Sequence, residues 1–432
     1  MSTLEVSLKL TPAWAISGAR LLAVPIVIFA VSFLGYYLSN PHPIAWYQHQ
    51  IYGAKALLDG TLDVSGTGIP GYYQDVVPRG EHRYLPFPIG PSLILVPFVA
   101  IWPAWGDGHS GGAYFTMALG AINVVLFWYL MGALGVSRNT KLLVTAFFAF
   151  GTPLFYSATT GTVWFYNHVV GLTFLLLALI ALFKRAPPVV PAILLGFAFL
   201  AREPMILSAP FFLYWLIVRR HGTLLSREAL FNRRTIFDAS QIFAGLLPFV
   251  IFWFVYNIAR FDDPLYTGYE YVWDSYAGLQ YSFYLKENPG AERFGLIDVR
   301  NIPLHLYTMF LMPPQFVPDW SVFRPSPYGM SMVLTSPAFV YAFLVKRRDA
   351  AKPALWLAIG LISIPLLLHY TQGWVQYGYR FMLDFAPFLL ILTAWGFDDN
   401  QSRTSRGIQI FLVGISIVAG FWGRHWANAY GW

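Results

Sequence analysis

The sequence has no cysteine and few charged residues. Without cysteine the chain has no disulfide, no thiolate metal site and no cysteine nucleophile. Charged residues make up 11% of the 432 residues, whereas a soluble domain carries about 25%. Hydrophobic residues make up 57% and gather in runs of about 15–22, most of them long enough to cross about 30 Å of hydrocarbon as helices. The composition therefore predicts an all-α integral membrane protein.

Several chemical motifs are absent as well. The sequence contains no GxxxxGK[ST] phosphate loop and no GxGxxG that opens a helix, which argues against nucleotide-driven and dinucleotide chemistry. It also lacks HExxH and GxSxG, and no group of histidines has the spacing of metal ligands. We expect no dedicated metal centre, although a divalent cation held by Asp75 and other carboxylates is compatible with the sequence. Basic cytoplasmic loops explain the net charge of +7, so nucleic acid is not expected as a partner.

About eleven apolar stretches, within a range of 10 to 13, are expected to be transmembrane helices. They cover approximately residues 20–38, 112–133, 140–158, 168–184, 188–202, 204–218, 240–258, 329–345, 353–370, 380–396 and 407–423. No internal repeat of fixed period, flexible linker or low-complexity tail interrupts them. The sequence therefore predicts one polytopic membrane domain over residues 1–432, and the oligomeric state stays open.

The basic residues predict which loops face the cytoplasm. More than half of the 28 Lys and Arg residues lie near the N-terminus or between alternate spans, so those segments are assigned to the cytoplasm. The loops 39–111 and 259–328 then face outside, and both are far longer than connectors need to be. Their many aromatic residues argue against disorder. Short interfacial helices are expected in them: residues 46–58 are amphipathic, the proline-rich run 85–106 is interpreted as re-entrant or interfacial, and 303–316 is treated alike.

The first long loop carries carboxylates beside basic residues. Such a combination supplies a general base and groups that bind an anion, although an ordinary solvated loop is the alternative. The candidates in this loop are Asp63, Asp75, Arg79, His82, Arg83 and Tyr84.

Other ionisable residues stand at the outer ends of spans. Arg202 and Glu203 lie between two apolar runs, where a charge is costly and faces a cavity or an ion-pair partner. Arg260 ends one span and Arg380 opens another, with Asp384 one helical turn later on the same face. Each arginine alone is also explained as an interfacial anchor. Together, outward arginines and carboxylates predict an anionic ligand, such as a lipid phosphate, because arginine recognises phosphate through two parallel hydrogen bonds.

Four segments resemble the GT-C superfamily, the polytopic glycosyltransferases that use polyprenyl-phosphate-linked sugars. The likeness is greatest to the dolichyl-phosphate-mannose-protein-mannosyltransferase-like proteins of glycosyltransferase family 39. It rests on an acidic first loop that enters the membrane through a Tyr-x-Pro run, an Arg-Glu-Pro helix end, a YN-x-x-RFG-x-P-like segment with Asp262 in place of Gly, and a QYGYRF segment. These segments are Gln74 to Phe98, Gly196 to Pro204, Tyr256 to Tyr269 and Gln376 to Leu390.

The resemblance implies a GT-C-like helical bundle and an inverting sugar transfer from a polyprenyl-phosphate donor to an acceptor hydroxyl. Residues 1–260 would form the GT-C-like module, 261–328 the second large outer loop and 329–432 the C-terminal helices. The resemblance implies a carboxylate base in the first loop, for which Asp75 is the best match and Asp63 the second. The other implied binding residues, for phosphate, sugar or acceptor, are Arg83, His82, Tyr84, His168, Arg202, Glu203, Arg260, Tyr269, Tyr379 and Arg380.

Two further functions compete with this one. A transporter or flippase of a lipid-linked or anionic substrate predicts charges deep within helices and pseudo-symmetric halves, whereas the charges here gather near one face. A non-catalytic scaffold leaves the outward arginines without a purpose. We expect a multi-pass protein of a bacterial inner membrane whose site faces outside. The sugar, the acceptor and the length of the lipid are left open.

Overall fold

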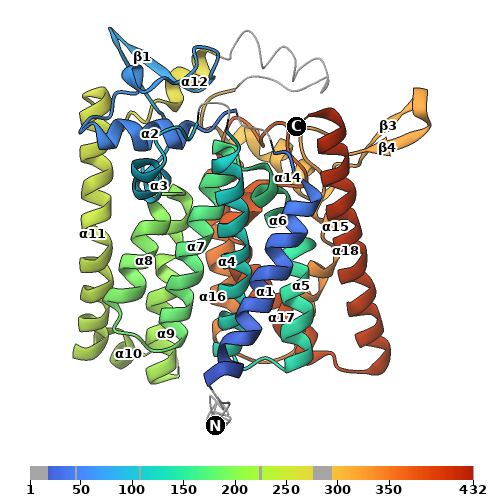
Figure 1. Ribbon diagram of the computed structural model, residues 1–432. Helices are drawn as coiled ribbons and strands as arrows, with labels where there is room; N and C mark the ends of the chain where they lie inside the picture. Colours follow the sequence, from blue (N-terminus) through green and yellow to red (C-terminus); the bar gives the residue numbers. More distant parts are fainter. Residues whose placement is uncertain (1–17, 44–45, 107–108, 223–225, 276–293, 432) are drawn as a thin grey trace.

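The computed structural model describes residues 18–43, 46–106, 109–222, 226–275 and 294–431. These residues form a bundle of roughly parallel helices, with two short β-hairpins at one end (Figure 1). Helix α1 starts at the opposite end of the bundle, and helix α18 finishes at the end that carries the hairpins. We call the hairpin-bearing end the loop end.

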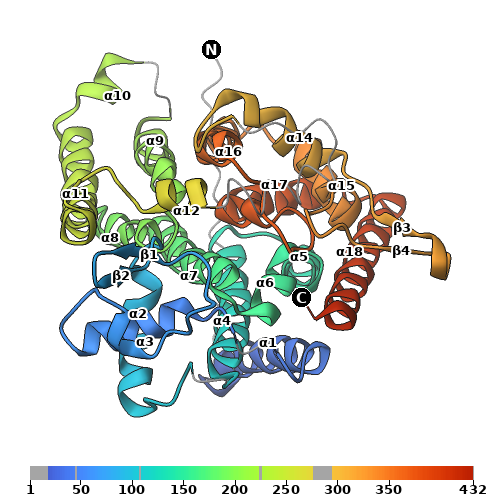
Figure 2. The ribbon, with the colours of Figure 1, turned by 90° about the horizontal axis from the view of Figure 1, so that it is seen from above.

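The helices of the first 261 residues stand side by side. They are α1 (Gly18–Ser39), α4 (Gly111–Ala133), α5 (Arg138–Phe150), α6 (Pro153–Thr160), α7 (Val163–Phe183), α8 (Val189–Phe199), α9 (Ala209–His221), α10 (Arg227–Phe231) and α11 (Arg233–Phe261). Helix α7 packs against α4 and α8, and α8 packs against α11. This row of neighbours forms one side of the bundle in the view from the loop end (Figure 2).

The C-terminal helices complete the bundle. They are α15 (Met332–Thr335), the 3₁₀ helix η5 (Pro337–Leu344), α16 (Ala351–Leu368), the 3₁₀ helix η6 (Arg380–Asp384), α17 (Ala386–Asp399) and α18 (Arg403–Tyr430). Nearly every side chain of α17 is buried. Helix α17 approaches η5 so closely that a Cβ atom at Gly396 would overlap the carbonyl oxygen of Tyr341. Only glycine therefore fits at this contact.

Within the described residues, five helices are long and apolar enough to cross a membrane: α4, α7, α11, α16 and α18. The pair α5 and α6, bent by 46°, makes a sixth if it is one span. The chain is thus a multi-pass membrane protein, while the expected number of eleven spans remains a prediction. Two of the expected spans, 329–345 and 380–396, are broken. Each contains a 3₁₀ segment next to an α-helix, and a proline lies in the first turn of the second segment, at Pro337 and Pro387.

The first long loop folds at the loop end. Its elements are α2 (His49–Leu58), the 3₁₀ turn η1 (Ser65–Thr67), β1 (Val77–Arg79), β2 (His82–Tyr84) and α3 (Gly90–Ile101). Strands β1 and β2 pair antiparallel, and α3 packs against α2 and α7. The backbone N–H of Gly90 donates to the carbonyl oxygen of Leu200, 2.8 Å away, which fixes α3 to the end of α8. With 12 residues, α3 is too short to cross the bilayer, and it lies beneath α2 (Figure 1).

The second long loop has its described elements at the same end. They are α12 (Tyr269–Ser275), α14 (Ile302–Phe310), β3 (Gln315–Val317), the 3₁₀ turn η4 (Pro318–Trp320) and β4 (Val322–Arg324). The β3–β4 hairpin projects away from the bundle in both views (Figures 1 and 2). Helix α14 has nine residues and is followed by β3, so the apolar run 303–316 does not form a spanning helix.

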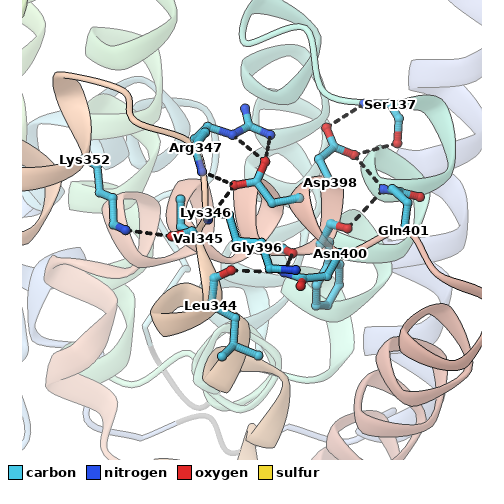
Figure 3. Close-up of polar contacts among 12 residues, drawn as sticks. Ser137, Leu344, Val345, Lys346, Arg347, Lys352, Gly396, Asp398, Asn400 and Gln401 are labelled. Atoms are coloured by element: carbon cyan, nitrogen blue, oxygen red, sulfur yellow. Dashed lines mark hydrogen bonds and ion pairs between the residues drawn. The ribbon is translucent and has the colours of Figure 1, made fainter.

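At the opposite end, two acidic residues at the C-terminal end of α17 form hydrogen bonds with neighbouring segments of the bundle (Figure 3). The Asp399 carboxylate accepts hydrogen bonds from the backbone N–H groups of Lys346 and Arg347 and from Nε of Arg347, at 2.8 to 2.9 Å. Asp398 accepts from the backbone N–H and hydroxyl of Ser137, the residue that caps α5. These contacts join three segments that are remote in sequence.

Replacing Asp399 with Ala is expected to lower the melting temperature of the purified protein by several degrees. The substitution leaves two backbone donors and a guanidinium without their acceptor, and each lost partner of this kind costs about 1–3 kcal/mol. Glu228→Ala is the matched control, because Glu228 is exposed on α10 and forms no hydrogen bond or ion pair with the described residues. Equal melting temperatures for both variants in differential scanning fluorimetry would contradict this role for Asp399.

Candidate active site

A cavity of about 720 Å³ opens at the loop end of the bundle, between the first loop and the C-terminal helices. Its walls come from the chain before α2, the start of α7, the junction of α8 and η2 (Glu203–Ser208), α12 and the loop before η6. Among the candidate residues, it brings together Asp75, His168, Arg202, Glu203, Tyr269 and Arg380. The volume lies in the range that small-molecule sites occupy.

Asp75 is held in a left-handed backbone conformation, with φ of 57°. Its Oδ2 accepts a hydrogen bond of 2.7 Å from the indole Nε1 of Trp164. Tyr47 and Val375, which also line the cavity, have positive φ as well. Such conformations cost free energy in non-glycine residues and concentrate at functional sites. The backbone thus presents Asp75 to the cavity at a cost that the surrounding fold offsets.

Arg202 is fixed by a buried carboxylate. Its Nε lies 3.1 Å from both oxygens of Asp384, and its Nη2 lies 2.7 Å from Oδ2. Asp384 is fully buried and also contacts Nδ1 of His168 at 2.7 Å. Within the described residues, Nη1 of Arg202 and Nε2 of His168 have no hydrogen-bond partner. Asp384 therefore orients Arg202 while leaving part of its guanidinium for a ligand.

The Arg380 side chain is buried, but no carboxylate pairs with it in the described part of the chain. Its Nη1 donates to the carbonyl oxygen of Trp374 at 3.3 Å, and its Nε has no partner there. The guanidinium carbon lies 5.1 Å from the ring centres of Phe165 and Phe381. Gly373, with φ of 102°, passes so close that a Cβ atom would lie 2.9 Å from Nη1. A buried guanidinium with unused donors is suited to an anion.

Tyr269 and two glutamates line the wall between these groups. Oε1 of Glu203 accepts from Nε1 of Trp253 at 2.7 Å, and Oε2 of Glu270 accepts from the backbone N–H groups of Thr267 and Gly268. Burial raises the pKa of the Tyr269 hydroxyl well above its usual range, and the Asp75 carboxylate raises it further, against the opposite effect of Arg202.

Arg260 lies outside the cavity lining. Its Nη1 donates to the carbonyl oxygen of Leu85, its Nη2 donates to Oδ1 of Asn257 at 2.7 Å, and its Nε donates to the carbonyl oxygen of Tyr256. The guanidinium carbon also stacks on the ring of Tyr256, 3.6 Å from its centre. These contacts anchor the first loop to α11, and the role predicted for Arg260 in binding a ligand stays a prediction.

Asp63 is also outside the cavity lining, and it closes the first loop upon itself. Its carboxylate accepts from the backbone N–H groups of Ser65 and Arg83 at 2.9 Å and contacts Nδ1 of His82 at 2.7 Å. Partial burial opposes ionisation, but these hydrogen bonds outweigh it and hold the pKa of Asp63 well below its usual range. Tyr84 packs edge-on against Phe261. The cavity lining contains none of the candidates Asp63, His82, Arg83 and Tyr84.

Tyr379 is fully buried and does not line the cavity either. Its hydroxyl lies 2.9 Å from Nδ1 of His305, whose Nε2 lies 2.8 Å from the carbonyl oxygen of His369.

The described residues contain no group of three or more His, Cys, Asp or Glu side chains arranged to hold a metal ion.

Comparisons with known proteins give structural neighbours but no sequence relatives. No family model matches the sequence, and no curated protein matches it significantly. The archaeal oligosaccharyltransferase AglB from Archaeoglobus fulgidus superposes with a TM-score of 0.50 at 12% identity, over 93% of this chain and 55% of its own. This likeness shows that the chain has a GT-C-like fold. ArnT from Cupriavidus metallidurans superposes with a TM-score of 0.48 at 13% identity, over 93% of this chain and 64% of its own. The chain thus spans little more than half the length of AglB.

Within this GT-C fold, sequence reasoning missed the most buried charge of the site. Asp384 was expected one helical turn after Arg380 on a common face, but the segment is the 3₁₀ helix η6, in which residues four apart do not align. Its carboxylate pairs with Arg202 and His168 instead. Glu203, expected to pair with Arg202 or another helix, binds Trp253. Trp164 gave no signal beyond being one of many aromatic residues.

Proposed function

We propose that this protein transfers a sugar from a polyprenyl-phosphate carrier to an acceptor hydroxyl. The observation that supports the proposal is a single cavity whose lining includes a first-loop carboxylate, Asp75, and two arginines, Arg202 and Arg380. The AglB neighbour was determined with a dolichol-phosphate. A carrier of that chemical class suits a membrane site with an apolar wall formed by Leu296, Ile297 and neighbouring residues.

In the proposed reaction the Asp75 carboxylate takes the proton of the acceptor hydroxyl. The acceptor oxygen forms a bond to the anomeric carbon as the bond from that carbon to the phosphate oxygen breaks. The polyprenyl phosphate leaves with the electron pair, and the configuration at the anomeric carbon inverts. General-base catalysis of this kind contributes about 10²–10⁴-fold.

The arginines stabilise the negative charge that develops on the leaving phosphate. Arg202 is preorganised by Asp384, so it does not have to reorient during the reaction. Arg380 contributes positive charge that no described carboxylate neutralises. The two come from opposite parts of the chain, one from the proposed GT-C module, residues 1–260, and the other from the C-terminal helices, residues 329–432. The loop 261–328 adds Tyr269 to the same wall.

The proposed site faces the side of the membrane away from the cytoplasm. The cavity lies at the loop end, whereas the basic residues of α10 and the start of α11 lie at the other end (Figure 1). Positively charged loops remain in the cytoplasm. A donor on the outer leaflet of a bacterial inner membrane would therefore reach the cavity.

The purified protein in lipid nanodiscs is expected to consume polyprenyl-phosphate sugars and release polyprenyl phosphate. Donors that carry different hexoses, pentoses and aminosugars are incubated with the protein and a mixture of hydroxyl acceptors. The products are followed by mass spectrometry, and the anomeric configuration is determined by NMR. If none of these donors is consumed, or if transfer retains the donor configuration, the proposed reaction is wrong.

A further inference from the structure

Aromatic side chains gather on the side of the cavity that the first loop and the start of α7 form. Trp46, Tyr47, Tyr72 and Trp164 all line it, and we call them the aromatic face. The ring of Tyr47 lies 6.5 Å from that of Tyr72 and 5.2 Å from that of Trp164. Trp46 and Tyr72 are 51% and 63% exposed, so the outer part of this face is open to solvent.

Asp75 is part of the same side of the cavity. The indole of Trp164 donates to its carboxylate, and Asp75 raises the pKa of Tyr47, after the larger effects of burial and of Tyr72. Tyr269 lines the same cavity, and after burial the Asp75 carboxylate raises the pKa of its hydroxyl, against the opposite effect of Arg202. Asp75 therefore contacts the aromatic face directly through Trp164, in the cavity that Arg202 and Arg380 also line. Because a base must touch the acceptor hydroxyl, the rings that contact Asp75 lie where an acceptor would approach it.

The chemistry of this face suits a carbohydrate. Flat aromatic rings attract the weakly positive C–H groups on the face of a pyranose ring, since the π face is negative. Polar groups stand among the rings: Gln74, Thr162 and Asn167 also line the cavity, and Oγ1 of Thr162 has no partner in the described region. Alternating stacking surfaces and hydrogen-bonding groups match a ligand with apolar faces and hydroxyl edges.

Among the described residues, the charge of this face favours a neutral acceptor over an anionic one. Among the lining residues from 46 to 88, Asp75 is the one formally charged side chain. Arg79 and Arg83 do not line the cavity, and Arg79 pairs with Asp262. An anionic group on this face would meet the Asp75 carboxylate with no lysine or arginine among the lining residues 46–88, and like charges repel.

Resting on the proposed function, we infer that the acceptor is a neutral glycan, one of whose pyranose rings stacks on the aromatic face while a hydroxyl reaches Asp75. The donor sugar is a second source of a pyranose ring. Kinetic constants distinguish an acceptor ring from the donor ring on this face. If the aromatic face holds the acceptor, its variants change the KM of the acceptor, whereas the donor KM depends on the phosphate contacts of Arg202 and Arg380.

The test uses wild-type protein with a donor that it consumes and three acceptor pools. These are neutral gluco-, manno-, galacto- and arabino-oligosaccharides, peptides rich in serine and threonine, and phosphorylated glycolipids. Transfer to the neutral oligosaccharides is expected to dominate. Preferential transfer to the peptides or to the phosphorylated lipids would overturn the inference while leaving the proposed function intact. Absence of donor consumption with every pool contradicts the proposed function itself.

Variants of Tyr72 test the stacking directly. Tyr72→Ala and Tyr72→Leu are expected to raise the oligosaccharide KM about tenfold, and Tyr72→Phe to keep it near the wild-type value, because stacking needs a flat ring. The donor KM is expected to stay constant. Tyr307→Ala is the matched control, since Tyr307 is exposed on α14 away from the cavity. An unchanged oligosaccharide KM in Tyr72→Ala, or full recovery by Leu, would contradict aromatic stacking.

Discussion

Asp75→Asn is expected to lower kcat for sugar transfer about 10²–10⁴-fold, the range that general-base catalysis contributes. Asparagine has the shape of aspartate, and its carbonyl oxygen still accepts the hydrogen bond from Nε1 of Trp164. The side chain therefore keeps its position but no longer takes the acceptor proton. The donor KM is expected to stay unchanged, because the phosphate contacts are elsewhere. Single-turnover assays with radiolabelled donor separate the two parameters.

The matched control is Asp63→Asn in the same loop. Asp63 closes the β1–β2 hairpin through Ser65, Arg83 and His82 and does not line the cavity. Its replacement is expected to lower the melting temperature and to leave the turnover of folded protein unchanged. Full transfer by Asp75→Asn would remove Asp75 as the base. Loss of turnover in folded Asp63→Asn would move that role towards the second candidate.

The long apolar helices could be predicted from the sequence because hydropathy directly reports what a lipid-facing helix needs. The predicted span 112–133 matches α4 within one residue, and 240–258 lies inside α11. The prediction for α7 began at residue 168, whereas the helix begins at Val163. Asn167 and His168 caused this error, because polar residues at a helix start look like a loop, although here both are buried against the cavity. The hydropathy of a polar residue does not report whether other parts of the fold bury it.

The members of the site could be predicted in part, and their partners could not. The order of charges along the chain pointed to Asp75, Arg202 and Arg380, which the cavity does bring together. Nothing local distinguishes Arg260 from them, because its guanidinium is used by backbone carbonyl groups, and these leave no trace in the sequence. Asp384 lies 182 positions after Arg202, so their contact depends on how the tertiary structure brings η6 to the junction of α8 and η2. Pairing of this kind is a property of the tertiary structure.

Arg380→Gln is expected to reduce kcat/KM for the donor about 10²–10³-fold, which corresponds to the loss of about 2.7–4 kcal/mol of transition-state stabilisation. Arg380 has no carboxylate partner among the described residues, so its removal leaves no buried anion behind. The melting temperature should therefore stay close to that of the wild type. Arg380→Lys is expected to recover part of the activity, because it restores the charge but not the planar pair of donors.

Arg202→Gln tests two roles of this arginine together, namely binding the donor phosphate and pairing with the buried carboxylate of Asp384. Its removal leaves the fully buried Asp384 carboxylate with His168 as its remaining partner. Breaking a buried ion pair in this way costs about 3–5 kcal/mol of stability. Arg202→Gln should thus lose stability and donor use together, whereas Arg380→Gln should lose donor use alone. Donor titrations and scanning fluorimetry on both variants measure this difference. Unaltered donor kinetics in Arg380→Gln would mean that its unused guanidinium donors do not bind the phosphate.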